Sequence, residues 1–193
     1  MVIAALGNPG EQYAGSRHNI AWQLIEHLSF YSELEWQFKF NADFVLYRPA
    51  GSDTPPHYIL LPLTYMNMSG KSVAALMRFY KLPLEDLLIV HDEIELEFGT
   101  FGFKLGGGLA GHNGLRSVST HLESRNFSRL RLGVSRPTYG DVTGYVLGGF
   151  DGDEKAVLPT FLESAARILE DNLTTPLADL AAEFKKCPTL PPG

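Results

Sequence analysis

The chain opens with Met1-Val2-Ile3-Ala4-Ala5-Leu6-Gly7-Asn8-Pro9-Gly10, the stretch that decides its fold class. The apolar run 2–6 predicts a buried strand, and Asn8-Pro9-Gly10 predicts a tight turn that ends it. Apolar residues then recur at helical spacing over 19–30. A buried strand that leads through a turn into a helix is typical of an α/β fold.

Strand and helix patterns continue to alternate along the rest of the chain. Strands are predicted at 38–47, 58–61, 87–90, 100–105 and 129–134. Helices are predicted at 69–80 (capped by Ser69), at 113–122 and at 151–184, the last interrupted near Pro176. We therefore predict one α/β domain over 1–184, with a twisted, mostly parallel or mixed β-sheet flanked by helices. Residues 185–193 are expected to form a flexible tail.

The charge of the chain is unevenly distributed. The net charge is −6, yet residues 99–137, here called the basic sector, hold six cations and one acid, which leaves −11 for the remainder. In the strand 129–134 the basic residues are expected to point outward. Charge alone favours a solvated face over a phosphate-binding surface, and both readings stay open.

Cysteine content and hydropathy limit where the protein can work. The single cysteine, Cys187, allows no internal disulfide, and this favours a cytoplasmic protein. No stretch is apolar enough to cross a bilayer, so no membrane partner is expected.

Polar side chains follow several of the predicted strands. Asn8 follows the first strand, Asn67 the strand 58–61, and Asp92 the strand 87–90. Asn113 begins a helix, and His18 lies just beyond the first turn. Because loops at the carboxyl ends of strands build the sites of such sheets, these five residues are expected to share one rim. A carboxylate beside an imidazole suits a general base near neutral pH.

Each of these residues also has a simpler explanation. An asparagine before proline is a common turn residue, and Asn67 or Asn113 could cap a helix. His18 could lie on the surface, and Asp92 could cap a turn. Only their convergence favours a catalytic site.

Other known motifs match only in part. Residues 106–111 have the spacing of a dinucleotide-binding loop, but the strand 129–134 ends without an acid for a ribose. Gly70-Lys71-Ser72 lacks the earlier glycine of a P-loop, and no Gly-x-Ser-x-Gly elbow occurs. Because no spaced histidine pair accompanies His91, no metal is expected.

Several short blocks carry a family resemblance. They are Leu6-Gly7-Asn8-Pro9-Gly10 with Tyr13, Arg17-His18-Asn19, Thr64-Tyr65-Met66-Asn67-Met68-Ser69-Gly70, His91-Asp92-Glu93 with Gly99, and Lys104-Leu105-Gly106-Gly107-Gly108 through Gly111-His112-Asn113-Gly114-Leu115-Arg116. In these blocks, and over nearly its whole length, the chain resembles the bacterial-type peptidyl-tRNA hydrolases.

The resemblance implies hydrolysis of the ester between a peptide and the terminal ribose of tRNA, without a cofactor or metal. It makes His18 the general base for water and Asp92 its orienting partner. The substrate-binding residues it implies are Asn8, Tyr13, Tyr65, Met66, Asn67 and Asn113. Lys104 and Arg131 would clamp the 5′-phosphate of the tRNA.

The resemblance also implies a partner: peptidyl-tRNA, held by its acceptor stem and 3′-terminal CCA end. DNA is not an expected partner, and the protein is expected to be a monomer. Residues 106–111 and 139–150 are expected to form a mobile lid and an opposing flap. Two other classes stay open, a nucleotide-binding oxidoreductase and a non-catalytic RNA-binding module.

Overall fold

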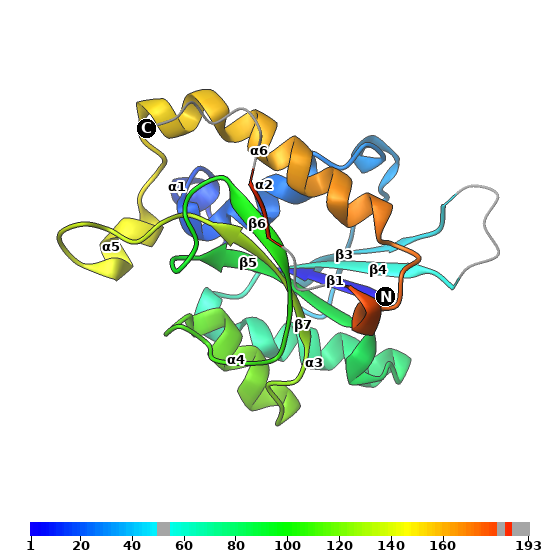
Figure 1. Cartoon of the computed structure of the whole chain (residues 1–193). Coiled ribbons are helices and arrows are strands. Elements are labelled where there is room, and N and C mark those ends of the chain that lie inside the picture. Colours follow the sequence, from blue (N-terminus) through cyan, green and yellow to red (C-terminus); the bar gives the residue numbers. More distant parts are fainter. Residues whose placement is uncertain (50–54, 181–183, 187–193) are drawn as a thin grey trace.

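The computed structural model describes residues 1–49, 55–180 and 184–186, and its centre is one mixed sheet (Figure 1). The strands occur in the spatial order β2-β3-β4-β1-β5-β7-β6-β8. Their bounds are β1 Val2–Ala5, β2 Gln37–Lys39, β3 Ala42–Tyr47, β4 His57–Pro62, β5 Leu87–Glu93, β6 Thr100–Leu105, β7 Ser128–Gly133 and β8 Phe184–Lys186. The four central strands β4, β1, β5 and β7 are parallel, while the outer pairs are antiparallel.

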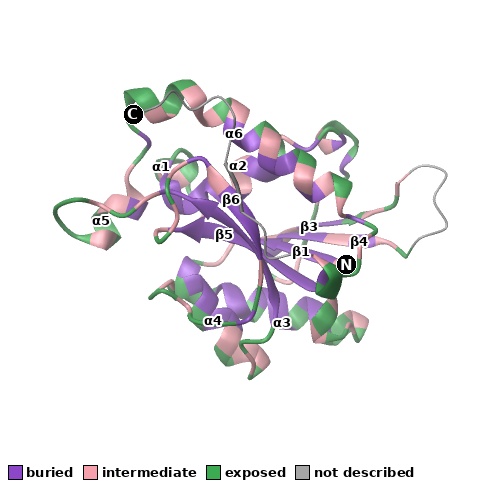
Figure 2. Ribbon diagram, in the orientation of Figure 1, coloured by how far each residue is buried: buried purple, intermediate pink, exposed green. Residues whose placement is uncertain are grey.

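Helices cover both faces of this sheet (Figure 1). They are α1 Glu11–Ala14, α2 Ile20–Glu26, α3 Ser69–Tyr80, α4 Asn113–Leu122, α5 Val142–Leu147 and α6 Gly152–Asp171. Two apolar clusters result, one beneath α2 and α6 and the other beneath α3 and α4. The sheet is buried throughout its centre, whereas α5 projects beyond its edge and is partly exposed (Figure 2). No helix among the described residues has the length and apolarity that a membrane crossing requires. The predicted α/β fold is confirmed.

The region 38–47 differs from the prediction of one long strand. It forms a hairpin, because Phe40 and Asn41 adopt positive φ angles of 61° and 53° between β2 and β3. A two-residue loop with both residues left-handed suits a tight antiparallel hairpin. Apolar and polar residues continue to alternate across the turn, so the sequence pattern does not reveal the hairpin.

Three helix predictions also need correction. The helix predicted over 19–30 begins at Ile20 and ends at Glu26. The helix predicted over 151–184 ends at Asp171. The hydroxyl of Ser69 donates to the carbonyl of Met66 instead of capping α3. Residues 185 and 186 lie within β8, while 187–193, the rest of the predicted tail with Cys187, lie outside the described residues.

The basic residues of β7 do not point outward as predicted. Arg129 is 1% exposed and Arg131 is 8% exposed. The guanidinium of Arg129 donates to the carbonyl oxygens of Gly107 (3.0 Å) and Gly108 (2.7 Å), so the glycine-rich loop lies over this strand. Alternation along a strand predicts which face a side chain points to, but not whether a loop covers that face.

Candidate active site

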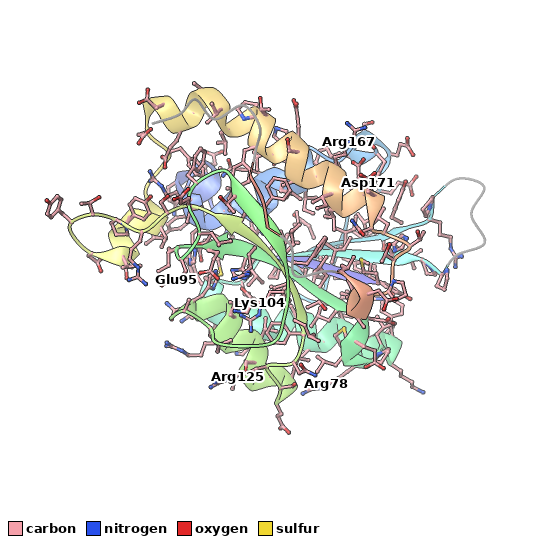
Figure 3. All side chains as sticks on the ribbon, in the orientation of Figure 1. Arg78, Glu95, Lys104, Arg125, Arg167 and Asp171 are labelled. Atoms are coloured by element: carbon pink, nitrogen blue, oxygen red, sulfur yellow. The ribbon has the colours of Figure 1, made fainter. Side chains whose placement is uncertain are left out.

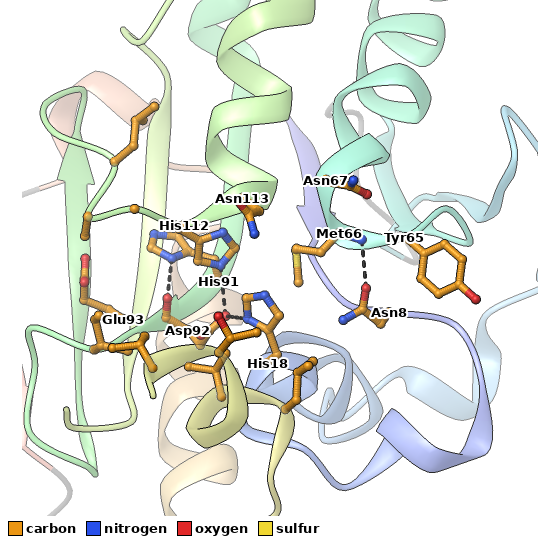
Figure 4. A pocket seen from close by; sticks show the side chains of 18 of the residues that line it. Asn8, His18, Tyr65, Met66, Asn67, His91, Asp92, Glu93, His112 and Asn113 are labelled. Atoms are coloured by element: carbon orange, nitrogen blue, oxygen red, sulfur yellow. Dashed lines mark hydrogen bonds and ion pairs between the residues drawn. The ribbon is translucent and has the colours of Figure 1, made fainter. Parts of the chain in front are cut away.

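A cleft of about 290 Å³ lies at the carboxyl ends of the central strands, and it contains the predicted rim residues. His18, Asp92 and the asparagines Asn8, Asn67 and Asn113 all line it (Figure 4). Tyr13, Tyr65 and Met66 line it as well. The predicted convergence is therefore confirmed. Lys104 and Arg131 are not among the lining residues, although Arg131 lies 3.9 Å from the lining carboxylate of Glu93.

The centre of the cleft is one carboxylate shared by two imidazoles. Oδ1 of Asp92 accepts from Nδ1 of His18 at 2.8 Å and from Nε2 of His112 at 2.9 Å (Figure 4). Asp92 lies within β5, which runs three residues past the predicted end of the strand, and its register partner is Leu132 of β7. Pairing with β7 and burial of the side chain give this carboxylate a fixed position.

The environment keeps Asp92 ionised. Burial alone would raise the pKa of this carboxyl group, but the two imidazoles and their hydrogen bonds outweigh burial and hold the pKa well below its usual range. An ionised carboxylate only accepts hydrogen bonds. Nδ1 of His18 and Nε2 of His112 must therefore both carry protons.

This assignment fixes the role of each imidazole. His112 begins α4 as its N-cap, and its Nδ1 accepts from the amides of Gly114 (3.1 Å) and Leu115 (3.3 Å). His112 is thus a neutral ring with its proton on Nε2. His18 carries a proton on Nδ1, which leaves Nε2 as its nitrogen toward the cleft. A neutral imidazole with a free nitrogen beside a cleft can accept a proton from water.

The hydrogen-bond pattern also bears on metal binding. His18, Asp92 and His112 bring their ligand atoms within 4.8 Å of one another, as a metal site would. However, both imidazole nitrogens that face Asp92 carry protons. The second nitrogen of His112 is occupied by the helix cap, so its proton cannot move there. The donor chemistry of these three residues therefore favours a hydrogen-bonded dyad with an auxiliary histidine over a metal centre.

His91 is a third histidine of the cleft. Its Nδ1 donates to the carbonyl of Asp92 at 2.7 Å, and its ring meets that of His112 edge to face, with centroids 5.1 Å apart. Burial lowers the pKa of His91 well below its ordinary value, so this ring is neutral. His91 packs behind His112.

Asn8 is held in place by hydrogen bonds with Asn19 and Met66. Its backbone amide donates to Oδ1 of Asn19 and its carbonyl accepts from Nδ2 of Asn19, each at 2.9 Å. Its side-chain Oδ1 accepts from the amide of Met66 at 2.8 Å (Figure 4). Because the oxygen is already occupied, the Nδ2 group of Asn8 is left as a donor toward the cleft.

The remaining walls of the cleft are apolar or exposed. Tyr65, at 62% exposed, and Asn67 stand on the rim, with Met66 buried between them. The opposite walls come from the end of β5, the glycine-rich loop and α5, and they are lined by Ile94, Leu109, Ala110, Val142, Val146 and Leu147. A narrow polar centre between apolar walls is typical of a site for an organic substrate.

Sequence reasoning missed several residues that build this site. The sequence assigns a substrate role to Asn113, whereas in the structure its neighbour His112 contacts Asp92. The sequence signal for His112 is its place directly before a predicted helix, where a side-chain acceptor is expected. Asn19 and Arg17 gave no separate signal, because their roles depend on contacts with residues distant in the sequence.

The glycine-rich loop does not have the chemistry of a dinucleotide site. Its carbonyls at 107 and 108 accept from Arg129, and the first free amides of α4 are occupied by His112. A dinucleotide loop instead presents free amides at a helix N-terminus to phosphate. The geometry thus disfavours the nucleotide-binding oxidoreductase.

The chain is similar to several known proteins over most of its length. The profile of the peptidyl-tRNA hydrolase family matches residues 2–190. A peptidyl-tRNA hydrolase of Geotalea daltonii is 42% identical, covering 88% of this chain and 87% of the relative. One from Listeria monocytogenes is 35% identical, covering 96% and 98%. The crystal structure of peptidyl-tRNA hydrolase from Acinetobacter baumannii superposes with a TM-score of 0.75 at 33% identity, covering 92% of each chain. The chain therefore belongs to the peptidyl-tRNA hydrolase family.

Proposed function

We propose that this chain hydrolyses the ester between a peptidyl group and the terminal ribose of tRNA, and that His18 activates the water. The observation that carries the proposal is the shared carboxylate. Asp92 holds His18 by Nδ1, which leaves Nε2 free in the cleft. This arrangement supplies a base without a nucleophilic side chain or a cofactor.

In the proposed reaction one proton passes from water through His18 to the ribose oxygen. Nε2 of His18 takes a proton from water while the water oxygen attacks the ester carbonyl, forming a tetrahedral oxyanion. The ribose oxygen then leaves with the proton that His18 returns, so that a free carboxylic acid and a free hydroxyl result. Asp92 stabilises the imidazolium that exists between these two transfers. General base catalysis of this kind contributes roughly 10²- to 10⁴-fold.

The amide side chains suit the charge and shape of the substrate. Nδ2 of Asn8 is a fixed donor toward the cleft, and we assign it to the developing oxyanion. Asn67 and Asn113 both line the cleft and are assigned to the peptide backbone. Tyr13, Tyr65 and Met66 would contact the terminal adenosine or the peptide.

Lys104 and Arg131 are proposed as the phosphate clamp. In the β6–β7 pair, Arg131 lies opposite Gly102 and Lys104 lies opposite Arg129, so all three cations share one face of the sheet. Gly102 has no side chain to cover Arg131 from the neighbouring strand. The carboxylate of Glu93 lies 3.9 Å from Arg131. The basic sector as a whole holds six cations against one acid, and this excess positive charge supports an anion near this face.

The acceptor stem is proposed to approach along the side of the sheet that carries α3 and α4. Figure 3 shows Lys104, Arg125 and Arg78 on that side, while Arg167 and Asp171 lie on the α6 side. Lys104 and Arg125 belong to the basic sector. We further propose that the protein acts in the cytoplasm as a monomer, which sedimentation of the purified chain would test.

The decisive experiment uses purified, chelator-treated protein with an N-blocked aminoacyl-tRNA. We expect free tRNA to appear, and we expect His18→Ala to keep its fold by circular dichroism but lose most of its turnover. A non-catalytic RNA-binding module would bind this substrate without cleaving it. Near-normal turnover by His18→Ala would contradict the proposed base.

The clamp has its own test. Lys104→Ala should raise KM for the full tRNA substrate much more than for a short aminoacyl-nucleotide ester, and should reduce the salt dependence of KM. Arg167→Ala is the matched control, because Arg167 is an exposed cation on the α6 side of the sheet, away from the proposed path of the stem. Equal effects of Lys104→Ala on both substrates would contradict the clamp.

A further inference from the structure

Arg17 directly precedes His18, yet its side chain binds a distant part of the chain. The guanidinium is 8% exposed. Its Nη1 donates to the carbonyl of Gly149, and its Nη2 donates to Oε2 of Glu154 at 2.5 Å. The guanidinium also lies over the ring of Tyr145, 4.1 Å from the centroid.

These partners lie in one short region, where α5 ends and α6 begins. The backbone adds two further contacts, since the amide of Arg17 donates to the carbonyl of Gly148 at 3.0 Å and Ser16 forms an antiparallel bridge with Gly149. Oε2 of Glu154 also accepts from the amide of Asp151, which closes the capping box of α6. The His18 segment is therefore joined to the base of α5 by several independent contacts.

The α5 helix forms one wall of the cleft. Val142, Thr143, Val146 and Leu147 of this helix line it. The hydroxyl of Tyr145 donates to the carbonyl of Val134 at 2.6 Å. The segment that precedes α5 is exposed, and Tyr139 within it is 91% exposed. Arg17 thus holds the end of the wall that adjoins His18.

We propose that Arg17 is a positioning residue that fixes the α5 wall against His18. The wall and the base then move as one unit, so that a substrate held by α5 presents its ester to Nε2 of His18. This inference rests on the proposed function. Without the guanidinium, the ion pair with Glu154 at the start of α6 and the contact with Tyr145 of α5 are lost. Only the fraction of molecules with the wall in place then binds substrate well, so the apparent affinity falls in proportion to that fraction.

The first test is Arg17→Met, which keeps the length of the side chain and removes its charge. We expect KM for N-blocked aminoacyl-tRNA to rise roughly 10- to 100-fold, with a smaller fall in kcat. Partial unfolding would lower kcat alone, because unfolded protein does not change the KM of the remainder. Arg17→Lys should recover part of the loss. Arg136→Met is the control, since Arg136 forms an exposed ion pair with Glu95.

A disulfide provides the rescue experiment. In a Cys187→Ser, Arg17→Met background, Ser16→Cys and Gly149→Cys place two thiols at the antiparallel bridge. We expect the oxidised protein to regain a low KM and to lose it again on reduction. A KM unchanged by Arg17→Met, or one not restored by the formed disulfide, would overturn the proposal. Should Arg17→Met not fold, Glu154→Gln removes the charged partner and must raise KM as well.

Hydrogen exchange separates this inference from the proposed reaction. Arg17→Met should speed exchange of the amides of 142–147, whether or not the wild-type protein cleaves the substrate. Unchanged exchange there would overturn the positioning role. Absence of cleavage by the wild-type protein would instead contradict the proposed function.

Discussion

Replacement of Asp92 by asparagine tests the shared carboxylate most directly. The amide has nearly the same shape, and its oxygen can still accept from His18 and His112. The negative charge is lost. In the ground state both imidazoles are neutral, so the variant keeps its hydrogen bonds in weakened form. In the transition state His18 is an imidazolium, and there the lost charge matters most.

The expected magnitude follows from the distance. At 2.8 Å, and with an effective dielectric constant of about 20, the attraction between an imidazolium and the Asp92 carboxylate is about 6 kcal/mol. A neutral hydrogen bond to the amide retains about 1 to 2 kcal/mol of this. The remaining loss of about 4 kcal/mol corresponds to a fall in kcat of roughly 10³-fold.

The assay is single-turnover cleavage of N-blocked aminoacyl-tRNA at saturating enzyme, which isolates the chemical step from binding. Glu95→Gln is the matched control, because it removes a carboxylate whose side chain is 54% exposed. A native circular dichroism spectrum must accompany the result. If Asp92→Asn retains a rate within tenfold of the wild type, the charge of this carboxylate does not drive the reaction.

Three further predictions concern the scaffold around the site. His112→Ala removes the N-cap of α4 and one donor to Asp92, so urea unfolding should show a loss of about 1 kcal/mol and turnover should fall; unchanged stability would contradict the cap. Burial lowers the pKa of His57 to about 4, so below pH 6.5 the unfolded chain binds a proton that the folded chain does not, and the free energy of unfolding decreases as the pH falls. His57→Leu should therefore lose about 2 to 3 kcal/mol less stability than the wild type when the pH is lowered from 7 to 4.5. Parallel stability–pH profiles for the two proteins would refute this. Gly70→Ala should lower the free energy of unfolding by about 2 kcal/mol or more, because a Cβ there would lie 2.2 Å from the carbonyl oxygen of Ser117. If the variant is as stable as the wild type, α3 and α4 can separate at no cost.

Much of the fold and the rim of the site could be predicted because their signals are local. The bounds of α3, α4 and β6 agree with the predicted ranges, since apolar periodicity is strong in each. The five rim residues could be predicted because parallel strands bring their carboxyl ends to one edge. The hairpin at Phe40 and Asn41 could not, because no glycine marks its positive φ angles.

The unpredicted part of the site consists of tertiary contacts. The sequence predicts the pairing of His18 with Asp92 through family resemblance, but one carboxylate oxygen that serves two histidines appears only when β5, α4 and the turn after β1 meet. The same holds for Arg17, whose partners lie more than 130 positions away.

The glycine-rich loop shows why a spacing motif can mislead when its polar groups are not followed. In a dinucleotide site the loop leaves helix amides free for phosphate. Here His112 occupies those amides, and Arg129 occupies the carbonyls of the loop. Arg129 on the cation face of β7 therefore holds the carbonyls of the loop, and His112 beside Asp92 holds the helix amides that follow the loop. It joins the proposed ester-cleaving centre to the proposed phosphate clamp, so a substitution at Arg129 should affect both substrate binding and turnover.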